Sequence, residues 1–151
     1  MHRICFNSDS DFGGLISRTN QNLNLKTMAN LPYKKLRIWN DSMLLTEKIY
    51  TITKNLPKEE IYGLTNQMRR CSVSIPSNIA EGYMRGRPKE IINFLLISLG
   101  SSAELETQLE ICRRLNFVSN EGTLELLADI SSIQKQMYSF IKAVEVRNGI
   151  I

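Results

Sequence analysis

Apolar residues recur every three or four positions from Leu31 onward, and no stretch of the chain alternates with the two-residue period of a β-strand. A helical period over this length predicts four long helices. Because the connections between them are short, neighbouring helices should run antiparallel. The sequence therefore predicts an all-α protein, an up-down-up-down antiparallel four-helix bundle over residues 31–151. We expect its helices at about 33–55, from Pro57 to a turn near Gly86, from there to about 115, and at about 121–146.

One stripe of residues on each predicted helix is expected to face the core. Trp39, the only tryptophan, lies on the first stripe, so we expect it to be largely buried in the bundle or at a subunit contact. The four stripes are Leu36, Trp39, Met43, Thr46, Tyr50 and Thr53; Ile61, Leu64, Met68, Cys71, Ile75, Ile79 and Tyr83; Ile91, Leu95, Leu99, Ser102, Leu105 or Glu106, Leu109 and Cys112; and Leu124, Leu127, Ile130, Met137, Ile141 and Val144.

Two residues interrupt the helical pattern. Pro76 lies inside the second helix, where it removes a backbone hydrogen bond and should bend the axis. Gly100 lies inside the third helix, at a cost near 1 kcal/mol relative to alanine. If the hairpin turns near Gly86, Ser72 faces Gly100, and small residues on both sides would let the two helices approach closely. A ligand pocket beside the bend is the alternative interpretation.

Residues 1–30 differ from the rest of the chain. They are rich in Asn and Ser and show no sustained period, which is typical of a disordered leader outside the core. Met28 is an alternative start, since every patterned residue follows it. No apolar run is long enough to cross a membrane, and no signal-peptide stretch follows the basic start. We therefore expect a cytoplasmic protein without membrane contact.

The side chains available restrict the chemistry. His2 is the only histidine, so the patterned part of the chain has no imidazole to act as a base. Cys5, Cys71 and Cys112 lie far apart, which argues against a zinc site, a redox pair or a disulfide framework. Glu81 and Glu104 are too far apart for a paired-carboxylate hydrolase. The sequence predicts no enzyme, no catalytic residues, no metal and no cofactor.

Several short strings make the sequence similar to a known family. The most specific is S-I-P-S-N-I-A-E-G at residues 74–82, and Cys71 is a mild departure, since a small apolar residue is usual there. Together the strings resemble the four-helix-bundle family of proteins encoded in intervening sequences of bacterial 23S ribosomal RNA genes, over about 33–145. The other strings are Leu36-Arg37-Ile38-Trp39, Ile49-Tyr50-Thr51-Ile52-Thr53, Tyr62-Gly63-Leu64, Gln67-Met68-Arg69-Arg70 and Glu104-Leu105-Glu106-Thr107-Gln108-Leu109.

This resemblance implies a homopentamer without enzymatic activity and with a poorly defined function. A more distant relative of the same fold is the accessory variability determinant of diversity-generating retroelements, which binds nucleic acid and a reverse transcriptase. The partners that follow are other copies of the chain, RNA or DNA, and a reverse transcriptase. Family membership indicates the fold better than the activity.

The charges are placed unevenly. The chain carries a net charge of +4. In an up-down bundle, one end collects eight cationic and four acidic residues, whereas acidic residues slightly outnumber cationic ones at the other. A basic end suits a phosphate backbone, and ordinary solubility charge or a protein-interaction module are the alternatives. The predicted nucleic-acid-binding residues are Arg85, Arg87, Lys89, Lys34, Lys35 and Arg37; Lys142 and Arg147 share that end with Asp41, Glu81, Glu90 and Glu145.

The pair Arg69-Arg70 also has two interpretations. Phosphate binding is one, but hairpin geometry places these arginines opposite residues 102–103, within reach of Glu104 and Glu106. An ion pair between the second and third helices is therefore the expected role. Glu81 and the neighbouring Asn78 are expected to cap or bridge helices near the bend.

Overall fold

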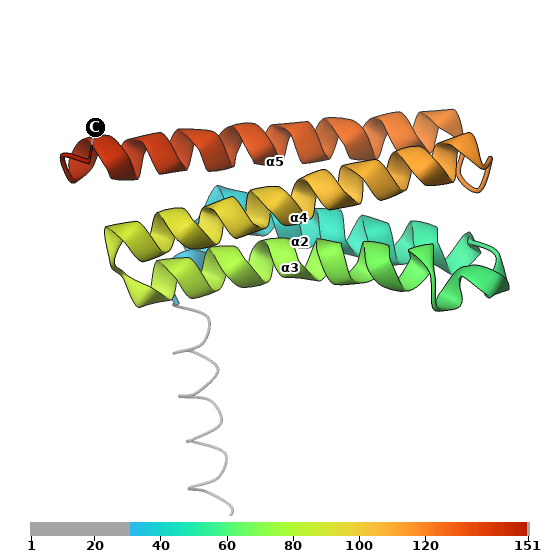
Figure 1. The fold of residues 1–151 in the computed structure, drawn as a ribbon, viewed down its shortest axis with the longest axis horizontal. Coiled ribbons are helices and arrows are strands. Elements are labelled where there is room, and N and C mark those ends of the chain that lie inside the picture. Colours follow the sequence, from blue (N-terminus) through green and yellow to red (C-terminus); the bar gives the residue numbers. More distant parts are fainter. Residues whose placement is uncertain (1–30, 151) are drawn as a thin grey trace, which may run out of the picture. The chain divides into compact units, whose positions relative to one another are not determined.

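The computed structural model describes residues 31–150, and these residues fold into four α-helices and several short 3₁₀ turns (Figure 1). No strand occurs within them, so the prediction of an all-α helical bundle is confirmed. The leader predicted over residues 1–30 lies outside the described residues. The elements are η1 (Pro32–Lys35), α2 (Arg37–Ile52), η2 (Thr53–Asn55), η3 (Lys58–Ile61), α3 (Leu64–Arg85), α4 (Pro88–Arg114) and α5 (Asn120–Arg147).

Neighbouring helices run antiparallel. On the α2–α3 side, the Thr46 hydroxyl donates to the carbonyl oxygen of Ser72 at 2.9 Å. Seven residues further along the chain, just after α2, the hydroxyl of Thr53 accepts from Arg69 at 2.9 Å. Residue numbers therefore fall on α3 as they rise on α2. Short turns join α3 to α4 at one end and α4 to α5 at the other (Figure 1).

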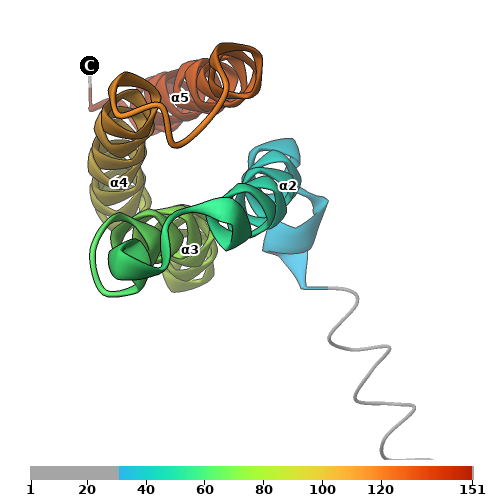
Figure 2. The same ribbon diagram turned by 90° about the vertical axis from the view of Figure 1, so that its right-hand side faces the viewer.

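The four helices do not pack equally against one another. Viewed end-on in Figure 2, α2, α3, α4 and α5 follow one another around the core. The contact between α3 and α4 is the most extensive, and the contact between α2 and α5 is the least extensive of the four neighbouring pairs. Core residues on both sides of this α2–α5 seam, such as Leu45 and Ile133, are nevertheless buried.

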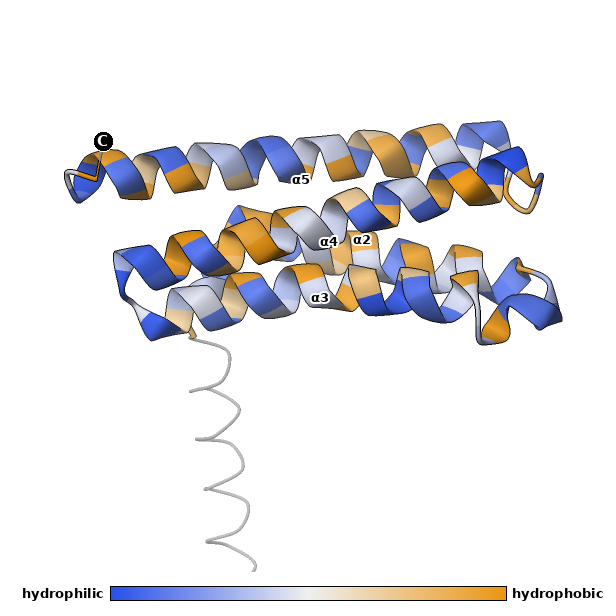
Figure 3. Cartoon of the chain, viewed as in Figure 1, coloured by the Kyte–Doolittle hydropathy of each residue, from blue (hydrophilic) through white to orange (hydrophobic). Residues whose placement is uncertain are grey.

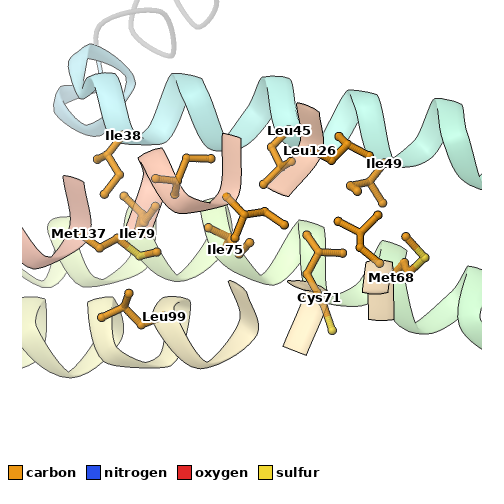
Figure 4. Close-up of a cluster of buried hydrophobic side chains, with 14 of the residues drawn as sticks. Ile38, Leu45, Ile49, Met68, Cys71, Ile75, Ile79, Leu99, Leu126 and Met137 are labelled. Atoms are coloured by element: carbon orange, nitrogen blue, oxygen red, sulfur yellow. The ribbon is translucent and has the colours of Figure 1, made fainter. Parts of the chain in front are cut away.

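The buried side chains of all four helices form one continuous core, part of which is drawn in Figure 4. For α3 and α4 the predicted stripes are confirmed over most of their length, because nearly every stripe position in the middle of each helix is buried. Fully buried members of these stripes include Met68, Ile75 and Ile79 on α3 and Leu95, Leu105, Leu109 and Cys112 on α4.

The stripe predicted for the first helix is wrong by one position over most of its length, although Thr53 at its end is buried as predicted. Met43 and Tyr50 are 37% and 41% exposed, and Trp39 is only half-buried, with its ring edge-on to Tyr33 at 5.3 Å between centroids. Trp39 is therefore not largely buried within this chain. The residues of α2 that face the core are Ile38, Ser42, Leu45 and Ile49.

A buried serine explains the shift in α2. The Ser42 hydroxyl donates to the carbonyl oxygen of Ile38 at 2.7 Å, so its burial leaves no polar group unsatisfied. A small side chain here lets α2 approach its neighbours, and the bulky Trp39 and Met43 then lie at the edge of the interface.

The beginnings of two helices also differ from the prediction. Residues after Pro57 form the separate turn η3, and α3 begins only at Leu64, whose backbone N–H donates to the Glu60 carboxylate at 3.0 Å. Ile61 is consequently exposed. In the first turn of α5, Thr123 is buried and Leu124 is 63% exposed, so the predicted stripe is wrong there too.

Close approach between α3 and α4 occurs, but not at Gly100. Gly100 is exposed, and a Cβ placed on it would meet nothing within 4 Å, so the predicted role of this glycine is wrong. Serines make the contact in the middle of the bundle. The hydroxyls of Ser74 and Ser101 are 2.8 Å apart, and Ser98 donates to the carbonyl oxygen of Ile75 at 3.1 Å, close to the buried Pro76.

Candidate nucleic-acid interface

The six predicted binding residues come from three segments at one end of the bundle. Figure 1 shows the beginning of α2, the α3–α4 turn and the end of α5 at this same end. Five of the side chains are exposed and Lys34 is half-buried. Lys34 and Lys35 lie in η1, Arg37 begins α2, Arg85 ends α3, Arg87 precedes α4, and Lys89 lies in the first turn of α4.

A tight turn concentrates three of these cations. Gly86 has a φ of 71°, in the left-handed region that glycine adopts without strain, and it ends α3. Pro88 then occupies the first turn of α4, where its missing N–H costs no helical hydrogen bond. The chain therefore reverses direction between Arg85 and Lys89, and Figure 3 shows this turn as strongly hydrophilic.

Two of the six residues are already engaged by carboxylates. Arg85 donates to Glu81 at 3.2 Å through Nε and to Glu90 at 3.1 Å through Nη1. These bonds raise the pKa of Arg85, so it stays fully charged. Arg37 pairs more weakly with Asp41, at 3.4 Å.

The other four cations are available. Within residues 31–150, Lys34, Lys35, Arg87 and Lys89 make no ion pair within 4.0 Å. Lys142 and Arg147 on α5 are exposed at the same end and likewise form no ion pair in this part of the chain. Since Arg85 and Arg37 occupy three of the four acidic residues there, Glu145 is the one acid at this end without a cationic partner among the described residues.

At the opposite end a carboxylate holds Arg113 and Arg114, whereas Lys54 and Lys58 form no ion pair within residues 31–150. Arg113 donates to both oxygens of Glu110, at 2.7 and 2.6 Å, and Arg114 adds a third bond at 2.9 Å. These hydrogen bonds lower the pKa of Glu110 from its ordinary value of 4.5 to about 2. The two ends thus differ in the number of cations left free to bind an external anion.

The predicted ion pair between Arg69 or Arg70 and the acids of α4 is not present. Arg69 turns to the end of α2 instead, where its guanidinium lies 4.9 Å from the centre of the Tyr50 ring and its Nε donates to Thr53 at the start of η2. Arg70 forms no ion pair with Glu104 or Glu106 in the described region. Glu81 bonds to Arg85 and Asn78 to Ser74, so each acts within α3 rather than between helices.

Sequence reasoning missed a cluster of charges across the α2–α5 seam. The ammonium group of Lys48 donates to Glu125 at 2.7 Å and to Asp129 at 2.8 Å. These bonds raise the pKa of Lys48 and lower the pKa of Glu125. Glu125 and Asp129 are four residues apart, which places both on one face of α5. This spacing was the sequence signal for a cluster of charges.

The described residues contain no group of three or more His, Cys, Asp or Glu side chains that could hold a metal ion. Cys71 and Cys112 are buried as free thiols. Burial, as the largest cause, raises the pKa of Cys71 to about 11 and keeps the thiol protonated at neutral pH. Across residues 31–150, no helix has the length and apolar character that a membrane crossing needs.

The fold and this end of the molecule define a small all-α bundle protein with one cationic end. Its sequence matches the 23S rRNA-intervening sequence proteins over residues 34–139, and the chain belongs to this family. It is also similar to a solved structure from Bacteroides thetaiotaomicron, described as a protein with unknown function from the S23 ribosomal protein family. The identity is 26% and the TM-score 0.63, over 70% of this chain and 98% of that one. No curated protein matches the chain.

Proposed function

We propose that this chain is a non-enzymatic, oligomeric protein that binds the phosphate backbone of RNA or DNA through its basic end. The observation that carries the proposal is the set of four cations, Lys34, Lys35, Arg87 and Lys89, that converge on one end without carboxylate partners in the described part of the chain. Free lysines and arginines gain more from a phosphate than paired ones, because no existing bond has to break.

The basic end favours backbone contacts over base recognition. Its two tyrosines are half-buried and already packed, Tyr33 against Trp39 and Tyr83 against Phe140 with 6.4 Å between ring centroids. Stacking on unpaired bases needs an exposed aromatic face. Binding should therefore depend strongly on salt and weakly on nucleotide sequence.

Assembly would multiply this surface. The family resemblance implies a homopentamer, and subunits arranged in parallel would place their basic ends in a ring. The outer face of α4 supports assembly, since Leu96 and Ile97 are exposed there beside the open surface of Gly100. Exposed apolar groups next to a glycine suit close packing of a second helix. Light scattering on the full chain tests the oligomeric state directly.

The experiment on binding is a salt titration. The wild-type chain is titrated with a labelled RNA hairpin and with duplex DNA, at salt concentrations of about 50 to 200 mM. Replacing Arg85, Arg87 and Lys89 together by alanine should weaken binding to unrelated sequences equally. It should also flatten the slope of log affinity against log salt by up to about three units per bound subunit.

A matched triple variant serves as the control. Lys54, Lys58 and Arg114 are cations at the opposite end, and replacing them removes the same total charge. This control should leave most of the salt slope intact. Equal losses in both variants, or no salt-sensitive binding by the wild type, would contradict the proposal. The alternative is then a protein-interaction module, such as an accessory subunit of a reverse transcriptase or another mobile-element enzyme.

A further inference from the structure

A groove runs along the seam between α2 and α5. Its volume is about 700 Å³, and it is lined by residues between Asp41 and Asn55 on α2 and η2 and between Gly122 and Ile133 on α5. The α2 side covers about 20 Å of helix axis, or about four helical turns. Among its apolar residues only Leu44, at 57%, is exposed to solvent, whereas Leu45, Leu126 and Ile133 are 1–4% exposed and belong to the core beneath the groove. The apolar residues are Leu44, Leu45, Ile52, Leu126 and Ile133.

The groove is negatively charged in a protein that is positive overall. Asp41 and Glu47 line its α2 side, and Glu125 and Asp129 line its α5 side. Lys48 is the single cation in the lining. A phosphate backbone would be repelled here, so the groove is unsuited to the nucleic acid expected at the basic end.

Lys48 shows what kind of group these carboxylates hold. Its ammonium lies between Glu125 and Asp129, 2.7 and 2.8 Å from their oxygens. The Lys48 side chain remains 44% exposed and that of Glu125 68% exposed, so a cation from outside can reach the same carboxylates. Glu47 has no ion-pair partner in the described region and offers a further site on the other wall.

We propose that the groove between α2 and α5 docks an amphipathic helix of a partner protein, with apolar residues facing the groove and lysine or arginine residues along its flanks. A groove of this length, with the exposed Leu44 along one wall and core residues beneath it, fits the apolar face of a helix. Charge complementarity selects the flanks, because acidic residues on both sides attract cations and reject a helix with acidic flanks. This surface is separate from the basic end and goes beyond the function proposed there.

The test uses the full-length chain and two synthetic peptides of about 18 residues, long enough for a helix to span the groove. One peptide carries leucine at helical spacing with lysine elsewhere, and the other has glutamate in place of lysine. Binding is measured by fluorescence anisotropy of a labelled peptide at about 150 mM salt. The lysine peptide should bind at least about tenfold more tightly than the glutamate peptide.

Two variants and two matched controls place the binding in the groove. Leu44→Ser and Glu47→Lys change exposed groove residues, and the Glu47 carboxylate has no hydrogen-bond or ion-pair partner in the described region. Each change should weaken binding of the lysine peptide at least about fivefold. Leu115→Ser and Glu59→Lys make the same changes at exposed positions outside the groove and should have little effect. Circular dichroism and light scattering on each variant confirm that helicity and oligomer mass are retained.

Three results would overturn the proposal. Equal peptide affinity in the groove and control variants would place binding elsewhere, and equal affinity for the two peptides would remove the role of charge. A loss of oligomer mass in Leu44→Ser would show that a second copy of the chain covers the groove instead. Neither groove variant should change the slope of log affinity against log salt for nucleic acid. The peptide experiment can therefore contradict the groove proposal without contradicting nucleic-acid binding at the basic end, and the reverse also holds.

Discussion

Gly82 on α3 lies so close to Phe94 on α4 that a Cβ placed on Gly82 would be 2.6 Å from the Cβ of Phe94. The Cβ of Phe94 is fixed to its backbone and cannot move aside without moving α4. Gly82 is buried one turn before the end of α3. This contact therefore sets the spacing of the two helices beside the turn that carries Arg85, Arg87 and Lys89.

The first prediction concerns this glycine. Gly82→Ala should lower the free energy of unfolding by about 1–3 kcal/mol, since the overlap costs more than the roughly 1 kcal/mol that alanine gains in a helix. Gly100→Ala is the matched control, because a Cβ there meets nothing within 4 Å. It should raise the free energy of unfolding by roughly 0.5–1 kcal/mol. Urea denaturation measures both, and a destabilising Gly100→Ala would indicate a neighbouring subunit packed on α4.

The second prediction compares two large residues of α2. Leu45 is 1% exposed in the core, whereas Trp39 is half-buried at its edge. Leu45→Ala should therefore cost about 2–5 kcal/mol, and Trp39→Ala about 1–3 kcal/mol despite the larger side chain. Chemical denaturation followed by circular dichroism gives both values. A larger loss for Trp39→Ala than for Leu45→Ala would show that the tryptophan is covered in the assembled protein.

The third prediction concerns acid stability. Arg113 and Arg114 lower the pKa of Glu110 to about 2 in the folded chain, against an ordinary value of 4.5. A carboxyl with a lowered pKa stabilises the fold above its unfolded pKa, and this contribution is lost as the pH falls from about 4.5 towards 2. Thermal unfolding of wild type and Glu110→Gln should therefore differ most near neutral pH and converge near about pH 2. Parallel curves across this range would contradict the assigned pairing.

The fourth prediction separates the cations of the α3–α4 turn. Arg87→Ala and Lys89→Ala should each flatten the salt slope of nucleic-acid binding by about one unit. Arg85→Ala should have a clearly smaller effect, because Glu81 and Glu90 already hold its guanidinium. Single-variant titrations against the same RNA hairpin measure all three slopes. A dominant effect of Arg85 would mean that it leaves its carboxylates on binding.

Much of the fold followed from the sequence because the apolar pattern is local. In the middle of α3 and α4, apolar residues lie on a single clear stripe, so positions such as Met68, Ile75 and Leu105 could be assigned to the core from their spacing alone. The α3–α4 turn was equally clear, since Gly86 and Pro88 are typical of a helix end followed by a new helix.

Helix α2 was harder to assign because it has apolar residues on two faces. Spacing alone did not separate the stripe through Trp39 and Met43 from the stripe through Ile38 and Leu45. The burial of Ser42 decided between them, since its hydroxyl bonds to its own helix and its small size allows close packing. Which face of α2 is buried depends on the helices that surround it, and the local sequence pattern does not specify those neighbours.

For the charged residues, too, the sequence determined one part of the arrangement and the tertiary structure decided another. The sequence by itself determined that one end of an antiparallel bundle would be basic, because helix order and short turns fix which termini lie together. Only the tertiary structure decided which cations are free, and that Arg69 binds across to α2 while Lys48 bonds to Glu125 and Asp129 on α5. Lys48 and Asp129 are 81 residues apart in sequence, and their contact depends on the packing of α2 against α5, which pairwise spacing along the chain does not encode.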